Sequence, residues 1–310
     1  MNRRWLWTLI LAVAALAAAT VRAAAPAADE IPAHRAKQIR DAAPEKARVA
    51  PQKPRRVLVW NTPLMEKSPH KGYCIPYGTA AMRALGEKTG AYEPVVSDDL
   101  AMLLPEKIKS FDAIVLNNAD GPWITPTDAA MERLKSAGAD KAAVEQVLRK
   151  SLLDYVSGGG GIMAYHFAIG GNTHWPEYRE MLGAAYSGHP WNEEVGVKLD
   201  EPDHPLMAAF AGKGFRITEE IFQFREPYSR KNVRVLLSLD TATTNMTVQW
   251  IERKDGDFAL AWVRPHGKGR VFYTAFGHRT ETFWNPAILQ FYLDGIQFAT
   301  GDLAAPAAPR

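Results

Sequence analysis

Residues 157–190, SGGGGIMAYHFAIGGNTHWPEYREMLGAAYSGHP, decide the fold of this chain. The glycine run ends a helix, and the short apolar run from Ile162 to Tyr165 predicts a buried strand. That strand ends at His166, which a glycine-containing segment follows. Ligands bind outside the carboxyl ends of the strands in an open parallel α/β sheet. We therefore predict that His166 belongs to the functional site.

Strands alternate with helices on both sides of this stretch. Before it, the sequence predicts strands at 57–60, 92–97 and 113–116, a helix around 79–85, and a longer helix that Asp140 caps. After it, the sequence predicts strands at 194–199, 215–224, 233–239, 258–263 and 270–275, a short helix at 205–210 and a last helix at 286–299. This order predicts an α/β flavodoxin-like sandwich with a mostly parallel central sheet and a strand-rich carboxyl-terminal half.

The first residues are typical of a secretory signal peptide. Arg3 and Arg4 precede an apolar run that ends in small residues, and we expect cleavage after Ala23. A membrane anchor is the alternative, but the run is short and rich in alanine for a spanning helix. The sequence therefore predicts residues 1–23 as a signal peptide and a periplasmic or secreted protein without a membrane anchor.

Composition divides the remainder into three parts. Residues 24–55 are rich in Ala, Pro and basic residues and predict a disordered spacer with a brief helix around 33–40. Residues 56–301 predict the folded domain, and residues 302–310 a frayed tail. The formal charge of +3 minus the +3 of residues 1–23 and the +4 of residues 24–56 leaves −4 for residues 57–310. Nothing in this balance indicates a nucleic-acid partner.

The single cysteine, Cys74, excludes an intrachain disulfide. A nucleophilic thiol needs an activating base, and the sequence identifies none beside Cys74. We interpret Cys74 as a small, partly buried residue near a turn.

The sequence resembles the trehalose-utilisation ThuA-like family over about residues 56–301. The resemblance rests on the order and spacing of several motifs: His166, Trp175-Pro176-Glu177-Tyr178, Gly183, His189-Pro190, Asp203-His204-Pro205, Glu219-Glu220 with Ile221-Phe222, 267–274, Gly277-His278 and Gly295-Ile296. It implies a fold similar to class I glutamine amidotransferases, with His166 where those enzymes carry their catalytic cysteine. Thioester chemistry is therefore not expected. The resemblance also implies a role in the catabolism of disaccharides or other glycosides, by way of 3-keto sugars.

Three residues are the predicted catalytic set. His166 is interpreted as a general base or a metal ligand, and His278 follows the strand at 270–275 toward the same sheet edge. Glu220 is interpreted as the acid partner, with a salt bridge to an arginine as the alternative. A divalent metal such as zinc would need three convergent ligands. His166 and His278 are the candidates, with one of His70, His174 or His189 as the third.

A second group of residues is predicted to bind a sugar. Asn61 and Asn118 follow strands, and aromatic and histidine side chains occupy the loops around them. The predicted substrate-binding set is Asn61, Asn118, Trp123, His174, Trp175, Tyr178 and His189. Indole rings on loops can stack on the apolar faces of sugars, and Trp191 is a further candidate, but such rings can equally cover the core.

Two function classes follow from these residues. The favoured hypothesis is an enzyme that acts on a glycoside or keto sugar by His/Glu acid–base chemistry. The alternative is a sugar-binding or accessory module without turnover. A hydrolase that uses Cys74 is the least favoured, because Cys74 lies well before the strand that ends at His166.

Overall fold

The computed structural model describes residues 31–62, 68, 70 and 73–310, so the predicted signal peptide lies outside the described residues. Within these ranges, none of the helices combines the length and apolar character needed to cross a membrane.

The described strands form one nine-stranded sheet in the order β2-β1-β3-β4-β11-β10-β9-β6-β7. The first five run parallel, and their order is that of a flavodoxin-like sheet. They are β2 (Glu93–Ser97), β1 (Arg56–Trp60), β3 (Ala113–Asn117), β4 (Gly161–Tyr165) and β11 (Gly269–Thr274). These bounds match the predicted runs. The strands inside the sheet read as continuous apolar sequence because both of their faces are buried, whereas β2 is a partly exposed edge strand.

The other four strands continue the same sheet in antiparallel pairing. They are β10 (Ala259–His266), β9 (Arg234–Leu239), β6 (Trp191–Leu199) and β7 (Phe215–Ile221). A separate two-stranded ladder joins β5 (Ala185–Tyr186) to β8 (Phe224–Arg225). The strand-rich carboxyl-terminal half is thus confirmed, and β7 ends before the predicted 224 because the chain leaves the large sheet there.

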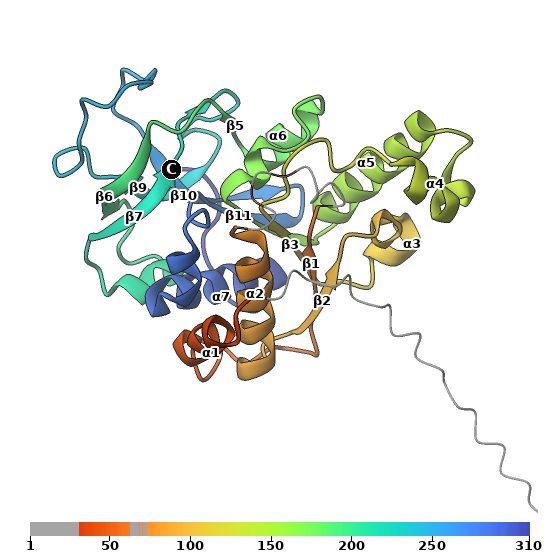
Figure 1. Cartoon of the computed structure of the whole chain (residues 1–310), viewed down its shortest axis with the longest axis horizontal. Coiled ribbons are helices and arrows are strands. Elements are labelled where there is room, and N and C mark those ends of the chain that lie inside the picture. The colour runs from red at the N-terminus through yellow and green to blue at the C-terminus, as the bar shows by residue number, and fades with distance from the viewer. Residues whose placement is uncertain (1–30, 63–67, 69, 71–72) are drawn as a thin grey trace, which may run out of the picture.

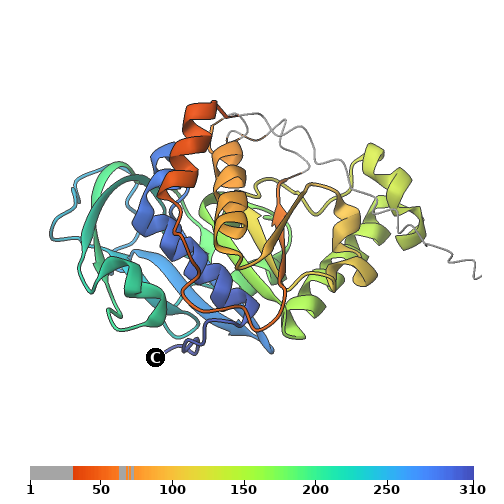
Figure 2. The same cartoon turned by 90° about the horizontal axis from the view of Figure 1, so that it is seen from below.

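Helices cover both faces of the parallel half (Figures 1 and 2). One face carries α1 (Ala33–Ala42), α2 (Ile75–Thr89) and α7 (Pro286–Thr300), and the other carries α3 (Pro105–Ile108), α4 (Asp128–Leu134), α5 (Lys141–Ser157) and α6 (Pro176–Leu182). Short 3-10 helices occupy Leu100–Leu103, Lys135–Ala137, His166–Gly170, Pro205–Phe210 and Thr280–Trp284. The core lies between these layers.

The glycine run at 158–161 is explained by packing. A Cβ on Gly161, the first residue of β4, would lie 2.0 Å from the carbonyl oxygen of Ala299 in α7. Only glycine allows the strand and the helix backbones to approach so closely. Gly161 therefore fixes where β4 starts. The carboxyl end of β4, at Tyr165, then lies at the edge of the sheet where the other parallel strands also end.

Residues 31–55 pack on the domain, which differs from the disordered spacer that their composition predicts. The brief helix exists as α1, with Ile39 buried. After it the chain follows α7, where the Arg48 guanidinium pairs with the buried Asp294 carboxylate (Nη2–Oδ2 2.7 Å). Gln297 also bonds the backbone of Val49. Composition misses this order because it comes from specific polar contacts between segments far apart in sequence.

The carboxyl-terminal tail also differs from the frayed end that its composition predicts. Asp302 is 8% exposed and Leu303 is 7% exposed. Farther along, the carbonyl oxygen of Pro306 lies 2.9 Å from Nε2 of His204. His204 therefore has a structural role, because it holds the tail on the domain. Both ends of the described chain thus pack on the domain.

Replacing Arg55 with alanine is expected to lower the free energy of unfolding by about 3 kcal/mol, because the buried Asp302 carboxylate loses its partner. The Arg55 guanidinium bonds Asp302 (Nη2–Oδ1 2.6 Å) and Asp112 (Nη1–Oδ1 3.0 Å). Urea unfolding measures the loss. The control is Lys53→Ala, which removes an exposed partner of the same Asp112 carboxylate and is expected to cost less than about 0.5 kcal/mol. Equal losses in both variants would contradict this account.

Candidate functional site

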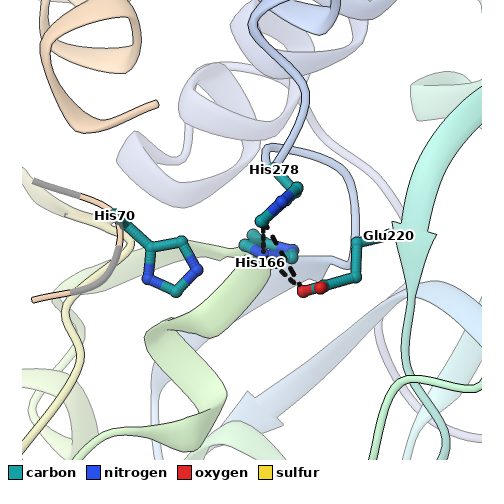
Figure 3. Close-up of side chains that lie close together, drawn as sticks. All are labelled: His70, His166, Glu220 and His278. Carbon is teal, nitrogen blue, oxygen red and sulfur yellow. Dashed lines mark hydrogen bonds and ion pairs between the residues drawn. The ribbon is translucent and has the colours of Figure 1, made fainter. Parts of the chain in front are cut away.

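The carboxyl edge of the parallel strands brings together four ionisable side chains from distant parts of the chain (Figure 3). His70 follows β1, His166 follows β4, Glu220 lies on β7 and His278 follows β11. Each offers one nitrogen or oxygen atom, and these four atoms all lie within 4.8 Å of one another. We call these four residues the histidine cluster.

His166 occupies a sharp turn between β4 and the 3-10 helix that follows it. Its φ of 47° is in the left-handed region, which a residue with a Cβ adopts only when its surroundings hold it there. The ring is fully buried, and its Nδ1 lies 3.0 Å from the carbonyl oxygen of Ala275. A carbonyl oxygen can only accept, so Nδ1 donates to Ala275 and Nε2 is the nitrogen that faces the cluster.

Three atoms of the cluster form a small triangle. Nε2 of His166 lies 3.2 Å from Nδ1 of His278 and 3.3 Å from Oε2 of Glu220, and the latter two atoms are 3.6 Å apart. Zinc bound tetrahedrally at about 2.0–2.1 Å holds neighbouring ligand atoms about 3.3–3.4 Å apart. The triangle therefore has the size of one face of a zinc coordination shell.

The charge states suit this geometry. The pKa of His278 is lowered to about 4, first by burial and then by the nearby His166, against the opposing effect of Glu220. Burial alone would raise the pKa of Glu220, but the adjacent His166, and after it His278 and His189, lower it on balance. At neutral pH the triangle thus contains a neutral imidazole at His278 and a carboxylate at Glu220, which are the forms that bind metal.

His70 stands beside the triangle and is oriented by Asp120. Its Nδ1 lies 3.0 Å from Oδ2 of Asp120, and both side chains are buried. Its ring meets those of His166 and His278 edge-on, at centroid distances of 5.4 and 5.6 Å. A carboxylate that fixes a histidine tautomer recurs at metal sites and at general bases. Sequence reasoning missed Asp120, although its place just after β3 is the signal that would have found it.

Glu219 holds the loop that carries His278. Its fully buried carboxylate accepts hydrogen bonds from the backbone N–H groups of Glu220, Gly277, His278 and Arg279, at 2.8–3.1 Å, and from the Thr282 hydroxyl. Burial raises the pKa of the Glu219 carboxyl, while these hydrogen bonds and His166 oppose the rise. Glu219 is thus a positioning residue for His278.

The side chains of the two asparagines in the predicted substrate-binding set are buried and hydrogen-bonded to other residues of the chain. The Asn61 side chain contacts Thr79 and Asn117 in a buried polar network. Asn118 is fully buried, donates to the carbonyl oxygen of Gly277 and accepts from the N–H of Phe167. Asn118 therefore ties the turn after His166 to the loop before His278.

The predicted aromatic contacts are core residues. Trp123, Trp175, Tyr178 and Trp191 are each 1% exposed or less. Tyr178 stacks on Trp175 and meets Trp123 edge-on. These rings cover the core beneath the loops, so they offer no face to a ligand.

The two remaining histidines lie in different places. His174 contacts Glu145 of α5 (Nε2–Oε1 2.9 Å) and does not join the histidine cluster. His189 is 41% exposed at its side chain, and its Nε2 lies 3.9 Å from Oε1 of Glu220. Of His70, His174 and His189, the structure thus brings His70 into the cluster and leaves His189 at its rim.

Cys74 is fully buried at the start of α2, and so is more buried than the partly buried turn residue that the sequence predicts. Burial raises the pKa of its thiol well above the usual range. A nucleophilic cysteine needs the opposite shift.

Two cavities lie near opposite edges of the sheet. One, of about 590 Å³, is lined by Asp120, Phe167 and the loop at 121–128, so it borders the histidine cluster. The larger one, of about 730 Å³, is lined by Arg55, Tyr155, Arg270 and neighbouring residues at the opposite edge. Neither cavity is lined by a member of the histidine cluster. We favour the smaller one as a substrate site, because its lining residue Asp120 bonds His70 and its lining residue Phe167 follows His166.

Comparisons with known proteins agree on the fold. The ThuA family, described as trehalose utilisation, matches residues 56–299. A crystal structure of a ThuA-like protein from Bacteroides uniformis ATCC 8492 is 22% identical with a TM-score of 0.57, over 81% of this chain and 92% of that one. A second ThuA-like protein, from Parabacteroides merdae ATCC 43184, is 17% identical with a TM-score of 0.50, over 82% and 93%. Comparison with curated proteins gave no match.

Proposed function

The chain belongs to the ThuA, trehalose-utilisation family, and from this premise we propose that it is an enzyme of carbohydrate catabolism. Its substrate would be a disaccharide, another glycoside or a 3-keto sugar, and its chemistry metal-assisted acid–base catalysis. The observation that supports this proposal is the triangle of His166 Nε2, His278 Nδ1 and Glu220 Oε2, with sides of 3.2, 3.3 and 3.6 Å.

His166, His278 and Glu220 would hold a divalent cation such as zinc. Two histidines and one glutamate are a known ligand set of catalytic zinc sites, in which the fourth position stays open. A cation there supplies a Lewis acid that polarises a carbonyl oxygen or a water molecule. The hydrogen bond of His166 Nδ1 to the Ala275 carbonyl oxygen supports the ligand role, because it leaves Nε2 free to bind.

His70 would transfer the proton. Asp120 orients its ring, and its ligand-type nitrogen lies within 4.8 Å of the three triangle atoms. In a 3-keto sugar the ketone acidifies the neighbouring C–H bond, so a histidine can remove that proton and drive elimination or isomerisation without a covalent intermediate. The cavity beside Asp120 and Phe167 offers space for such a substrate.

Metal content and turnover of the purified protein test this proposal. Turnover is measured on a panel of disaccharides and their 3-keto forms, before and after chelation. We expect one divalent cation per chain, turnover that chelation abolishes, and loss of both in His166→Ala. The control is His174→Ala, because His174 bonds Glu145 outside the cluster and its variant is expected to retain metal and turnover.

Two other outcomes would change the proposal. Turnover in a metal-free protein that His166→Ala abolishes would make the cluster a plain acid–base site. Saturable sugar binding without product under any condition would favour the non-catalytic sugar-binding module.

A further inference from the structure

Trp250 departs from the burial pattern of the other large apolar side chains. It is 69% exposed, and it is the one large hydrophobic side chain exposed within the described part of the chain. It lies in the polar loop between β9 and β10, which the sequence interpretation passed over. Contact with a protein partner would need a much larger apolar area than one indole ring provides. A single flat ring suits a ligand of similar size.

The backbone holds this ring in place at a conformational cost. Trp250 has a φ of 73°, a left-handed conformation that is an outlier for a bulky residue. Its carbonyl oxygen accepts a hydrogen bond of 2.7 Å from Nε2 of Gln223, a side chain that is 1% exposed. Oε1 of Gln223 accepts from the N–H groups of Glu252 and Arg253 in the same loop. Such strain persists only where the surroundings enforce it. Here the buried Gln223 amide holds the backbone of Trp250 and of the residues just after it.

A chain of ring contacts connects Trp250 to the histidine cluster. The Trp250 ring meets His189 edge-to-face, with centroids 6.0 Å apart. His189 stacks on Tyr186 and bonds its hydroxyl, and Nε2 of His189 lies 3.9 Å from Glu220. Trp250 therefore stands one side chain beyond the rim of the cluster.

We propose that Trp250 is a stacking platform for a pyranose ring of the substrate, next to the ring that the histidine cluster acts on. This inference rests on the proposed function. The C–H face of a pyranose packs on an indole face, and Trp combines a large apolar area with few rotatable bonds. His189, half-exposed between the platform and Glu220, is within reach of hydroxyl groups of the same ligand. The site would thus favour a substrate of two linked rings over a single sugar.

Equilibrium binding to wild type, Trp250→Ala and Trp250→Phe tests the platform. Titration calorimetry with trehalose, maltose and glucose gives the affinities, and circular dichroism and metal content check that the variants fold. We expect Trp250→Ala to weaken disaccharide binding roughly fivefold to tenfold, to leave glucose binding within about twofold, and Trp250→Phe to recover most of the loss. Sugar should also shift the tryptophan emission of wild type to shorter wavelength, and this shift should be absent in Trp250→Phe.

The outcomes separate this inference from the proposed function. Disaccharide binding by wild type that Trp250→Ala leaves unchanged would overturn the platform alone. A change of oligomeric state in Trp250→Ala, seen by light scattering without a change in sugar affinity, would also overturn it and assign Trp250 to contact between copies of the chain. Wild type that binds none of the three sugars and turns over none of the keto sugars would overturn both proposals.

Discussion

Glutamine in place of Glu220 is expected to lower the affinity for a divalent cation by at least about 100-fold and to abolish turnover. Replacing a residue that only hydrogen-bonds a metal ligand already lowers metal affinity about 10–100-fold. Glu220 would be a ligand itself, so we expect a larger loss. The substitution keeps the size of the side chain but removes the negative charge that lies 3.3 Å from Nε2 of His166 and 3.6 Å from Nδ1 of His278. Competition with a chelating dye measures the affinity.

The matched control is Glu193→Gln, the same change at an exposed position of β6 that pairs with Glu219 of β7. This variant is expected to bind the cation and turn over substrate like wild type. Unchanged cation affinity in Glu220→Gln together with lost turnover would contradict the ligand role and leave Glu220 as a proton donor.

Glutamine in place of Glu219 is expected to act through the loop that carries His278. The Glu219 carboxylate accepts five hydrogen bonds. Its Oε2 accepts two of them, from the Gly277 N–H and the Thr282 hydroxyl. An amide must place its NH₂ group against some of these donors, which leaves buried N–H groups without an acceptor. We expect unfolding free energy to fall by about 2 kcal/mol and cation affinity to fall about 10–100-fold.

Thermal unfolding of the metal-free protein and cation titration measure these two effects separately. Glu281→Gln serves as the control, because Glu281 is exposed in the same segment and holds no backbone donor in the described contacts. Loss of stability without loss of cation affinity would show that Glu219 supports the fold but does not position His278.

The fold was predictable because each parallel strand reads as a short apolar run between helical segments. The strand-end rule also found His166 and His278, since their strands β4 and β11 are neighbours in the sheet. Glu220 is interpreted from the sequence as the acid partner, and its carboxylate lies 3.3 Å from Nε2 of His166. The pairing of His70 with Asp120 did not follow, because it depends on how the loops after β1 and β3 meet.

The aromatic residues show what the sequence left open, since loop tryptophans can stack on a sugar or cover the core. Trp123, Trp175 and Tyr178 lie among glycines and prolines, which suggests exposed loops, yet all three rings fill the core. Trp250 lies among polar and charged residues, and its ring is the exposed one. Burial of a loop aromatic is decided by what packs over it, and that depends on tertiary contacts that local sequence does not encode.

The four residues of the histidine cluster lie at positions 70, 166, 220 and 278, so the cluster exists only after both halves of the sheet have joined. A ligand that binds the folded chain alone stabilises it, by about 4 kcal/mol at a thousand times its dissociation constant. A cation held by His166 of the parallel half and Glu220 of the antiparallel half would therefore act as a cross-link between them. Loosening of either half would release it, so cation occupancy would report the completeness of folding across the whole sheet.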